Sequence, residues 1–207
     1  IVRDVVRAND LRDASIRMTL TRGVDHPVLL VTARPPDRRW QELAQNGWRI
    51  ITAATRRPST AAIPAQLKAL GRTYALLARH EAVDAGVHDV LLLNDDGHVC
   101  EGPTWNVFWR VGDVLFTPSL DTGVLAGVTR TALIQLAADA GYTVREDRFA
   151  RAALDDADEV FASMTSVGIV PVRELDGRAL PDDTPAALAL LAAYHDLVAS
   201  ETARDPL

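Results

Sequence analysis

The chain has 207 residues, of which 48% are hydrophobic and 24% are charged, and its formal net charge is −6. Such values are typical of a globular domain with a buried core. The acidic balance, without a basic block interleaved with aromatic residues, argues against a nucleic-acid partner. No apolar run reaches membrane-spanning length, and the single cysteine, Cys100, excludes an internal disulfide. No signal-peptide pattern is present, so the sequence predicts a cytoplasmic protein.

The first part of the chain predicts one helix and three strands. Residues 1–8 follow a helical period, and residues 14–23, 28–35 and 48–55 read as strands. Because the chain starts inside a helical pattern and without methionine, we expect further sequence before Ile1. A polar, proline-containing stretch at 55–62 predicts a linker. Residues 1–54 are then the remainder of a small N-terminal α/β domain, and residues 63–207 form a larger domain.

The larger domain mixes helices with strands. A helix is predicted over 66–85, with Gly86 at its end, and residues 89–118 read as a β-meander with turns at Asp96-Gly97 and Gly112-Asp113. The later expected elements are a helix from about 128 to 140, a strand at 142–147, a short helix at 152–157, strands at 159–164 and 169–177, and a final helix over 184–201. The pattern indicates an α+β fold with a largely antiparallel, barrel-like sheet between about 88 and 180.

Several common site types are absent from the sequence. The histidines lack HxxxH or HExxH spacing and one cysteine cannot build a thiolate site, so we expect no metal centre. The sequence has no GxGxxG after a strand, no GxxxxGK[ST] and no GxSxG. The positive charges are unusual instead: of 22 Lys and Arg residues, only Lys68 is a lysine. It is either a stray residue on a solvated surface or a nucleophile, because an amine can attack a carbonyl and a guanidinium cannot.

Three further stretches contain residues suited to chemistry. In AGVTRTAL (126–133), Gly127, Val128 and Thr129 stand where a loop becomes a helix, which suits either phosphate binding or ordinary capping. In CEGPTWN (100–106), Glu101 is either a turn residue or a carboxylate held for a purpose. In FASMTSVGIVP (161–171), the hydroxylated residues are phosphate donors or part of a polar loop; they are Ser163, Thr165 and Ser166.

Together these residues match the three functional groups by which a protein can bind pyridoxal 5'-phosphate. A lysine can form a Schiff base with its aldehyde, a carboxylate can pair with its ring nitrogen, and a helix N-terminus with threonines can bind its phosphate. The sequence therefore predicts one site for this cofactor.

The motifs resemble those of the fold-type IV pyridoxal-phosphate enzymes. This family comprises branched-chain, D-amino-acid and (R)-amine aminotransferases and aminodeoxychorismate lyases. RRPSTAAIPAQLKAL (56–70) resembles the segment before the Schiff-base lysine, with Arg57 11 positions earlier (68 − 57). EGPTWNVF (101–108) resembles EGxxxN[VIL]F, 33 positions after Lys68 (101 − 68). LAGVTR (125–130) and DADEVFASMTSVGIVPV (156–172) resemble the family's phosphate loop and its ADEVF block.

The resemblance implies a role for each matching residue. Lys68 would carry the cofactor as a Schiff base and move the proton, and Glu101 would keep the ring nitrogen protonated. Arg17 would help to place the substrate carboxylate, or would pair within the small domain. The residues implied in binding the cofactor phosphate are Gly127, Val128, Thr129, Thr165 and Ser166. The family also implies a homodimer.

The chain departs from the family pattern at several points. Relatives carry several dozen residues ahead of the position of Ile1, including an arginine that binds phosphate. Gly71 stands where many have asparagine, and Thr73 where branched-chain enzymes have a tyrosine, with Tyr74 one position off. After TRG the chain reads VDHP, without the arginine used by D-amino-acid aminotransferases.

Three functions follow as hypotheses. The first is a class IV aminotransferase that transfers an amino group from an amino acid or amine to a 2-oxo acid. The second is an aminodeoxychorismate lyase that releases pyruvate and 4-aminobenzoate, because Lys68 with Arg72 and NVFWRVGDVLFTPSLD (106–121) resemble lyases of the family. The third is a relative that keeps the fold without catalysis.

Overall fold

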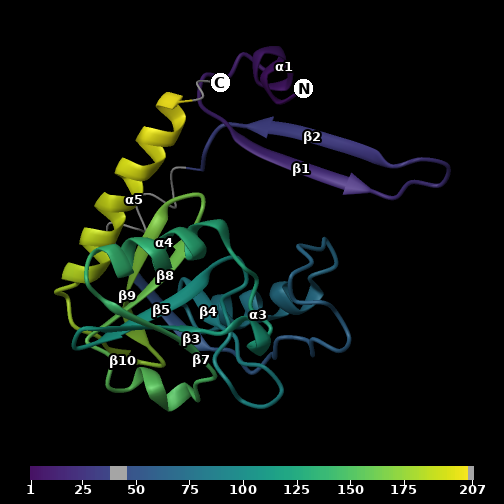
Figure 1. Cartoon of the computed structure of the whole chain (residues 1–207). Helices are drawn as coiled ribbons and strands as arrows, with labels where there is room; N and C mark the ends of the chain where they lie inside the picture. The colour runs from purple at the N-terminus through teal and green to yellow at the C-terminus, as the bar shows by residue number, and fades with distance from the viewer. Residues whose placement is uncertain (38–45, 205–207) are drawn as a thin grey trace.

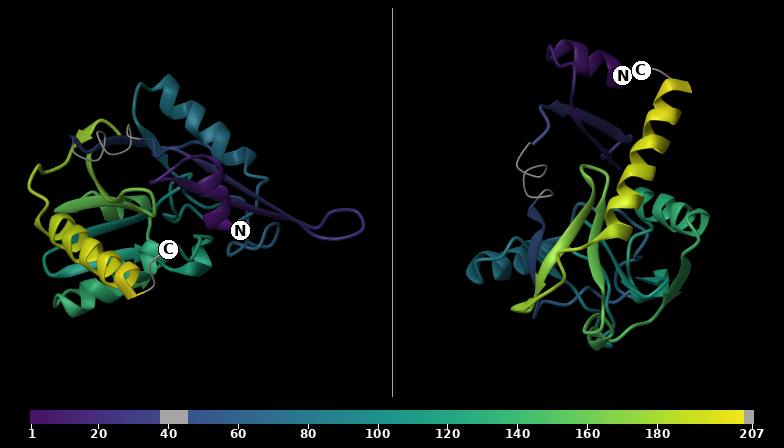
Figure 2. Two further views of the ribbon diagram at one scale, coloured as in Figure 1. Left: turned by 90° about the horizontal axis from the view of Figure 1, so that it is seen from above. Right: turned by 90° about the vertical axis from the view of Figure 1, so that its left-hand side faces the viewer.

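Two sheets of unequal size organise the chain (Figure 1). The computed structural model describes residues 1–37 and 46–204. Helix α1 (Val2–Ala8) precedes the smaller sheet, an antiparallel hairpin of β1 (Ser15–Thr21) and β2 (Val28–Arg34). The hairpin projects away from the rest of the molecule in both figures (Figures 1 and 2), and Met18 and Leu20 on it are largely exposed.

The remaining elements form the larger body. They are β3 (Trp48–Thr52), α3 (Thr73–Asp84), β4 (Asp89–Leu91), β5 (Asn106–Val111), β6 (Val114–Pro118), η1 (Leu120–Thr122), α4 (Val128–Asp139), β7 (Thr143–Asp147), η2 (Arg151–Leu154), β8 (Glu159–Met164), β9 (Gly168–Leu175), β10 (Arg178–Ala179) and α5 (Pro185–Arg204). Among the residues that the structure describes, no helix has both the length and the apolar character needed to cross a bilayer.

The larger sheet is mixed and has eight strands. Its order is β4-β3-β9-β8-β5-β6-β7, with β10 paired to β9. The pairs β3–β4, β3–β9 and β6–β7 are parallel, and the others are antiparallel. Hydrogen bonds between Leu92 and residues 100–101, and between Val99 and Phe149, link the two ends of this order. The expected α+β fold with a barrel-like sheet is therefore confirmed.

Strand β3 belongs to the larger sheet, although the sequence placed it with the N-terminal region. It lies between β4 and β9, and its Trp48 and Ile50 are completely buried. A short apolar run says that a strand exists but carries no information about its partners. Strand β3 therefore pairs within the larger sheet, and the domain division after residue 54 stays a prediction.

Helix α3 begins at Thr73 rather than at residue 66 as the sequence predicted. The side chain of Gln66 is engaged outside the helix: its Nε2 donates to the Val124 carbonyl (3.0 Å) and its Oε1 accepts from the Ala126 N–H (2.8 Å). These tertiary bonds and the local turns at 64–72 override the helical period. Lys68 consequently lies in an irregular segment. The short helix expected at 152–157 is the 3-10 helix η2.

Helices α4 and α5 pack together over the part of the large sheet that holds Phe108 and Phe161, and α3 packs over another part, next to Val90 and Leu92 (Figure 2). Between the sheet and α4 and α5, Phe108 and Phe161 stack with ring centroids 5.4 Å apart, and Leu133 and Leu190 pack against them. A second core on the opposite face contains Trp48, Trp105 and Trp109.

The N-terminus of α5 is held by a buried carboxylate. Glu159 on β8 accepts hydrogen bonds from the N–H groups of Ala186 (3.2 Å) and Ala187 (3.0 Å), and its exposed fraction is only 1%. Arg110 on β5 donates to the same carboxylate at 2.6 Å. A carboxylate here satisfies free N–H groups at the positive end of the helix. The pair therefore attaches α5 to the sheet.

Replacing Glu159 by alanine should lower the free energy of unfolding by about 3 kcal/mol, because Arg110 is left without its buried partner. Chemical denaturation of the purified protein measures the loss. Asp158 is a matched control, since it pairs with the same arginine at 3.1 Å but its side chain is 48% exposed. Asp158→Ala should cost less than about 1 kcal/mol. Equal losses in the two variants would contradict the assignment.

Candidate active site

A cavity of about 380 Å³ opens where four segments of the larger body meet. The segments are the 66–72 loop, the stretch around Glu101, the N-terminus of α4 and the end of β8. The register of the sheet helps to form it, because Asn106 at the start of β5 lies opposite Ser163 near the end of β8. The volume falls within the range of about 300–1,000 Å³ common for small-molecule sites.

Glu101 is buried at the wall of this cavity, with 4% of its surface exposed. Its Oε2 accepts hydrogen bonds from the Leu125 N–H (2.9 Å) and from Asn106 Nδ2 (3.2 Å). Its Oε1 lies 3.4 Å from Nε of Arg57, but that N–H is donated to the Gly123 carbonyl (2.9 Å). Oε1 is therefore a buried oxygen without a hydrogen bond.

Burial raises the pKa of Glu101 above the usual carboxyl range. The Leu125 N–H and the positive charges of Arg57, Arg72 and Lys68 act in the opposite direction and favour the ionised form. A cationic hydrogen-bond donor placed against Oε1 would also favour the ionised form of Glu101. The carboxylate is therefore suited to hold a protonated nitrogen.

The loop before α4 is fixed from two sides. The Gln66 side chain hydrogen-bonds Val124 and Ala126 of this loop, and Asn106 Nδ2 donates to the Leu125 carbonyl (3.1 Å). Gly127 is the N-cap of α4, and no side chain caps the helix there. A helix of this length with uncapped N–H groups facing a cavity favours a bound anion. The loop thus presents the start of α4 to the cavity with Glu101 on its wall.

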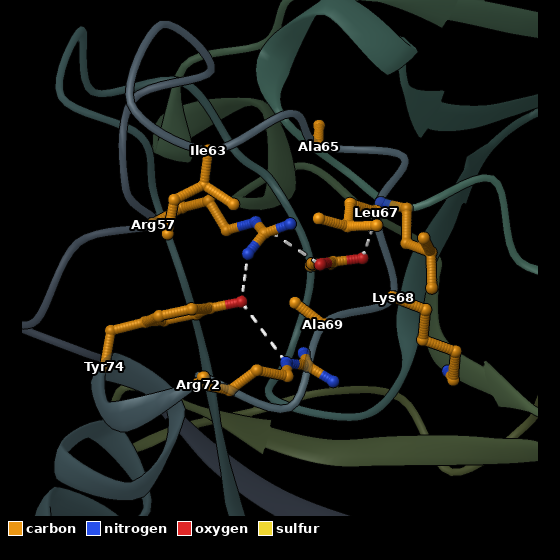
Figure 3. Close-up of a pocket in the computed structure, with 11 residues that line it drawn as sticks. Arg57, Ile63, Ala65, Leu67, Lys68, Ala69, Arg72 and Tyr74 are labelled. Carbon is orange, nitrogen blue, oxygen red and sulfur yellow. Dashed lines mark hydrogen bonds and ion pairs between the residues drawn. The ribbon is translucent and has the colours of Figure 1, made fainter. Parts of the chain in front are cut away.

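Two arginines and a tyrosine form a network beside Glu101 (Figure 3). Arg57 donates to the Tyr74 hydroxyl, and Arg72 donates to the same hydroxyl at 3.4 Å and to the Pro103 carbonyl. The Arg57 guanidinium also lies 5.1 Å from the centroid of the Tyr74 ring. These contacts keep two positive charges close to the buried carboxylate.

Known proteins share both the sequence and the structure of this chain. The family model for amino-transferase class IV matches residues 1–175. The branched-chain-amino-acid aminotransferase of Escherichia coli strain K12 is 35% identical over 191 residues, covering 84% of this chain and 60% of that protein. The Pseudomonas aeruginosa enzyme of the same name is 30% identical over 213 residues, covering 97% and 69%.

A solved structure agrees with these sequence relatives. The branched-chain amino acid aminotransferase of T.th. with pyridoxamine 5'-phosphate superposes with a TM-score of 0.86 at 32% identity, covering 99% of this chain and 70% of that one. The chain belongs to the class IV aminotransferase family. It spans about three fifths of the length of the E. coli relative.

Six of the residues predicted for the site line the 380 Å³ cavity of this member of the class IV aminotransferase family: Lys68, Glu101, Gly127, Val128, Thr129 and Thr165. Ser166 lies outside it, in a neighbouring groove between the β8–β9 turn and α5 that Thr165 also lines. Arg17, on β1, lines a larger open groove of about 960 Å³ that Lys68 shares. The fold therefore brings the residues of four separate motifs together.

Lys68 is exposed and lines both the cavity and the open groove. Figure 3 shows it on the opposite side of the pocket from Arg57 and Tyr74, with its side chain directed away from them. The lone lysine of the chain is therefore neither packed in the core nor isolated on a distant helix face.

Sequence reasoning gave no role to Gln66 or to the Tyr74 hydroxyl, and it did not predict the contact of Arg72 with Tyr74. The sequence patterns around these residues gave little indication of their contacts. Gln66 stood in an expected helix, and Tyr74 was one position away from the family's tyrosine. The sequence singled out Ser163 only as one of three hydroxylated residues.

Gly127→Ala tests the tight approach of the loop to β5. A Cβ at this position would lie 2.2 Å from Oδ1 of Asn106, so the loop or Asn106 must move. We expect a loss of about 1–3 kcal/mol in the free energy of unfolding. Gly71→Ala is the control, because nothing lies within 4 Å of a Cβ there, and it should stay within about 0.5 kcal/mol of wild type. A neutral Gly127→Ala would show that the loop is loosely held.

Cys100 should resist alkylation in the folded protein. It is completely buried next to Glu101 and its thiol donates to the Thr122 carbonyl, and burial raises its pKa to about 12. Only about one thiol in ten thousand is then ionised at pH 8. Iodoacetamide labelling followed by intact mass should give no adduct without denaturant and one adduct in guanidinium chloride. Rapid labelling of the native protein would mean that the wall behind Glu101 opens.

Proposed function

We propose that this class IV aminotransferase holds pyridoxal 5'-phosphate in the 380 Å³ cavity and transfers an amino group from an amino acid or amine to a 2-oxo acid. The observation that carries the proposal is the Oε1 atom of Glu101, which is buried without a hydrogen bond in the same cavity as Lys68 and the start of α4. The T.th. relative with pyridoxamine 5'-phosphate supports the choice of cofactor.

The residues present fit this cofactor at each of its polar ends. Glu101 Oε1 has an ion pair with Arg57 but no hydrogen bond, and it suits the protonated ring nitrogen because buried polar atoms are rarely left without a hydrogen bond. The uncapped first turn of α4 suits the phosphate. Lys68 supplies an amine within the same lining. The Ser163 hydroxyl is a second buried atom without a partner, and it adds a donor to the cavity wall.

Each protein group has a distinct task in the proposed reaction. When bound, pyridoxal phosphate supplies an aldehyde that condenses with amines and a ring that withdraws electrons from the substrate carbon next to the amine. Glu101 accepts the ring N–H and holds that proton in place. Lys68 would supply the amine that attaches the cofactor, and its Nζ would move the substrate proton from the carbon next to the amine. The positive charges of Arg57 and Arg72 favour the ionised form of Glu101.

The phosphate and the substrate are assigned to the remaining predicted residues. The N–H groups of Gly127, Val128 and Thr129, with the hydroxyls of Thr129 and Thr165, would orient the phosphate. Ser166 lines the neighbouring groove, so its predicted part in phosphate binding would require a shift of the β8–β9 turn. Arg17 attracts the substrate carboxylate from the groove that it shares with Lys68. The homodimer implied by the family and the cytoplasmic location expected from the sequence remain predictions. Analytical ultracentrifugation can test the oligomeric state.

Elimination by an aminodeoxychorismate lyase is the alternative reaction. The names of the relatives described above favour amino-group transfer. Formation of glutamate from 2-oxoglutarate supports the proposal, whereas release of pyruvate and 4-aminobenzoate from aminodeoxychorismate supports the lyase. Absence of cofactor binding in the full-length protein would favour a non-catalytic relative.

Lys68→Arg should abolish covalent attachment of the cofactor while keeping the charge. Wild-type protein incubated with pyridoxal phosphate should turn yellow, and borohydride reduction followed by peptide mass mapping should place the adduct on the peptide that contains Lys68. The variant should show neither signal, and transamination should fall by at least about 10³-fold. An adduct elsewhere, or a variant with unchanged activity, would refute the assignment.

A further inference from the structure

Tyr194 on α5 reaches the first turn of α4. Its hydroxyl lies 3.3 Å from Oγ1 of Thr129, at hydrogen-bond distance with either oxygen able to donate. Thr129 is 2% exposed and also lines the 380 Å³ cavity. A side chain from the last helix therefore contacts a residue that the proposed function assigns to the phosphate.

The ring of Tyr194 also packs against the β8–β9 turn. A Cβ added to Gly168 would lie 2.8 Å from Cδ1 of Leu191 and 3.3 Å from Cδ1 of Tyr194, so these α5 side chains sit directly over the glycine. Gly168 has a φ of +76°, in the left-handed region that glycine adopts without strain. The same turn contains Thr165 and Ser166. Tyr194 thus lies against both segments assigned to the phosphate.

The position of Tyr194 is set by the anchor of α5. Glu159 holds the N–H groups of Ala186 and Ala187, and Tyr194 follows Ala187 by seven residues (194 − 187), about two helical turns. Figure 2 shows α5 beside α4 on the same side of the sheet. A helix fixed at its N-terminus and packed on Gly168 holds the hydroxyl in one place.

The geometry leaves the Thr129 proton available to a ligand. A threonine hydroxyl has one proton and two acceptor lone pairs. Thr131, two residues later, donates its proton back to the Gly127 carbonyl (3.1 Å). The equivalent carbonyl for Thr129 is that of Leu125, which already accepts from Asn106. If Tyr194 donates to Thr129, the Thr129 proton is free to point into the cavity.

We propose that Tyr194 is a positioning residue for the cofactor phosphate: its hydroxyl donates to Thr129, and this orients the Thr129 hydroxyl to donate to a phosphate oxygen. The inference rests on the proposed function. Two hydrogen bonds in series strengthen one another, so loss of the outer bond weakens the inner one. Tyr194 itself does not touch the cofactor.

The test compares Tyr194→Phe with Tyr142→Phe, a matched loss of one hydroxyl elsewhere in the core around α4. The measured quantities are the dissociation constants for pyridoxal phosphate and for pyridoxal, which lacks the phosphate. Tyr194→Phe should weaken binding of pyridoxal phosphate about three- to tenfold and leave binding of pyridoxal unchanged. In a Thr129→Val background the same substitution should have no further effect.

Three results would overturn the inference. They are unchanged affinity for pyridoxal phosphate in Tyr194→Phe, an equal loss for pyridoxal, and an equal loss in Tyr142→Phe. Inorganic phosphate separates this inference from the proposed function. If wild type binds no pyridoxal phosphate, the proposed function fails; a rise in Tm with inorganic phosphate that disappears in Tyr194→Phe would still support Tyr194. A rise in Tm that persists in that variant would refute its role.

Discussion

The buried carboxylate of Glu101 constrains how the central segments of this protein meet. A charged group taken out of water costs several kcal/mol unless it gains hydrogen bonds or an opposite charge. Here the compensation comes from Leu125, Asn106 and Arg57, which belong to separate stretches of the chain. The loop before α4, the start of β5 and the segment after β3 must therefore assemble around one side chain. Gly127 lies close to Asn106, and Gln66 hydrogen-bonds the residues on either side of Leu125, so both residues are adjacent to partners of Glu101.

The two buried glutamates of the sheet region illustrate opposite uses of the same chemistry. Glu159 has partners on both oxygens, supplied by Arg110 and two helix N–H groups, and so it joins secondary-structure elements. Glu101 has partners on Oε2 but no hydrogen bond on Oε1. A carboxylate with hydrogen bonds to both oxygens contributes to the fold, whereas a carboxylate with one buried oxygen that lacks a hydrogen bond can accept one from a ligand. This difference in bonding separates a structural glutamate from a candidate functional one better than burial alone.

The sequence predicted the family, most of the elements and the meeting of Lys68, Glu101 and the start of α4, because these rest on local patterns and motif spacing. It could not place β3, since an apolar run does not specify its neighbours. The sequence prediction extended α3 over Gln66 and Lys68, because a helical period carries no information about the tertiary hydrogen bonds of Gln66. It also gave no sign of Tyr194, whose contact with Thr129 joins residues 65 positions apart through the packing of α5 on the sheet.

The charge composition of the chain has a practical consequence at the site. Because every basic side chain except Lys68 is an arginine, the exposed Lys68 is the only side-chain amine in these 207 residues. Reagents that acylate amines therefore have one side-chain target, which borders both the cavity and the groove of Arg17. A fluorophore, a cross-linker or an isotope-labelled methyl group attached through this chemistry would report from the candidate active site without any engineered residue.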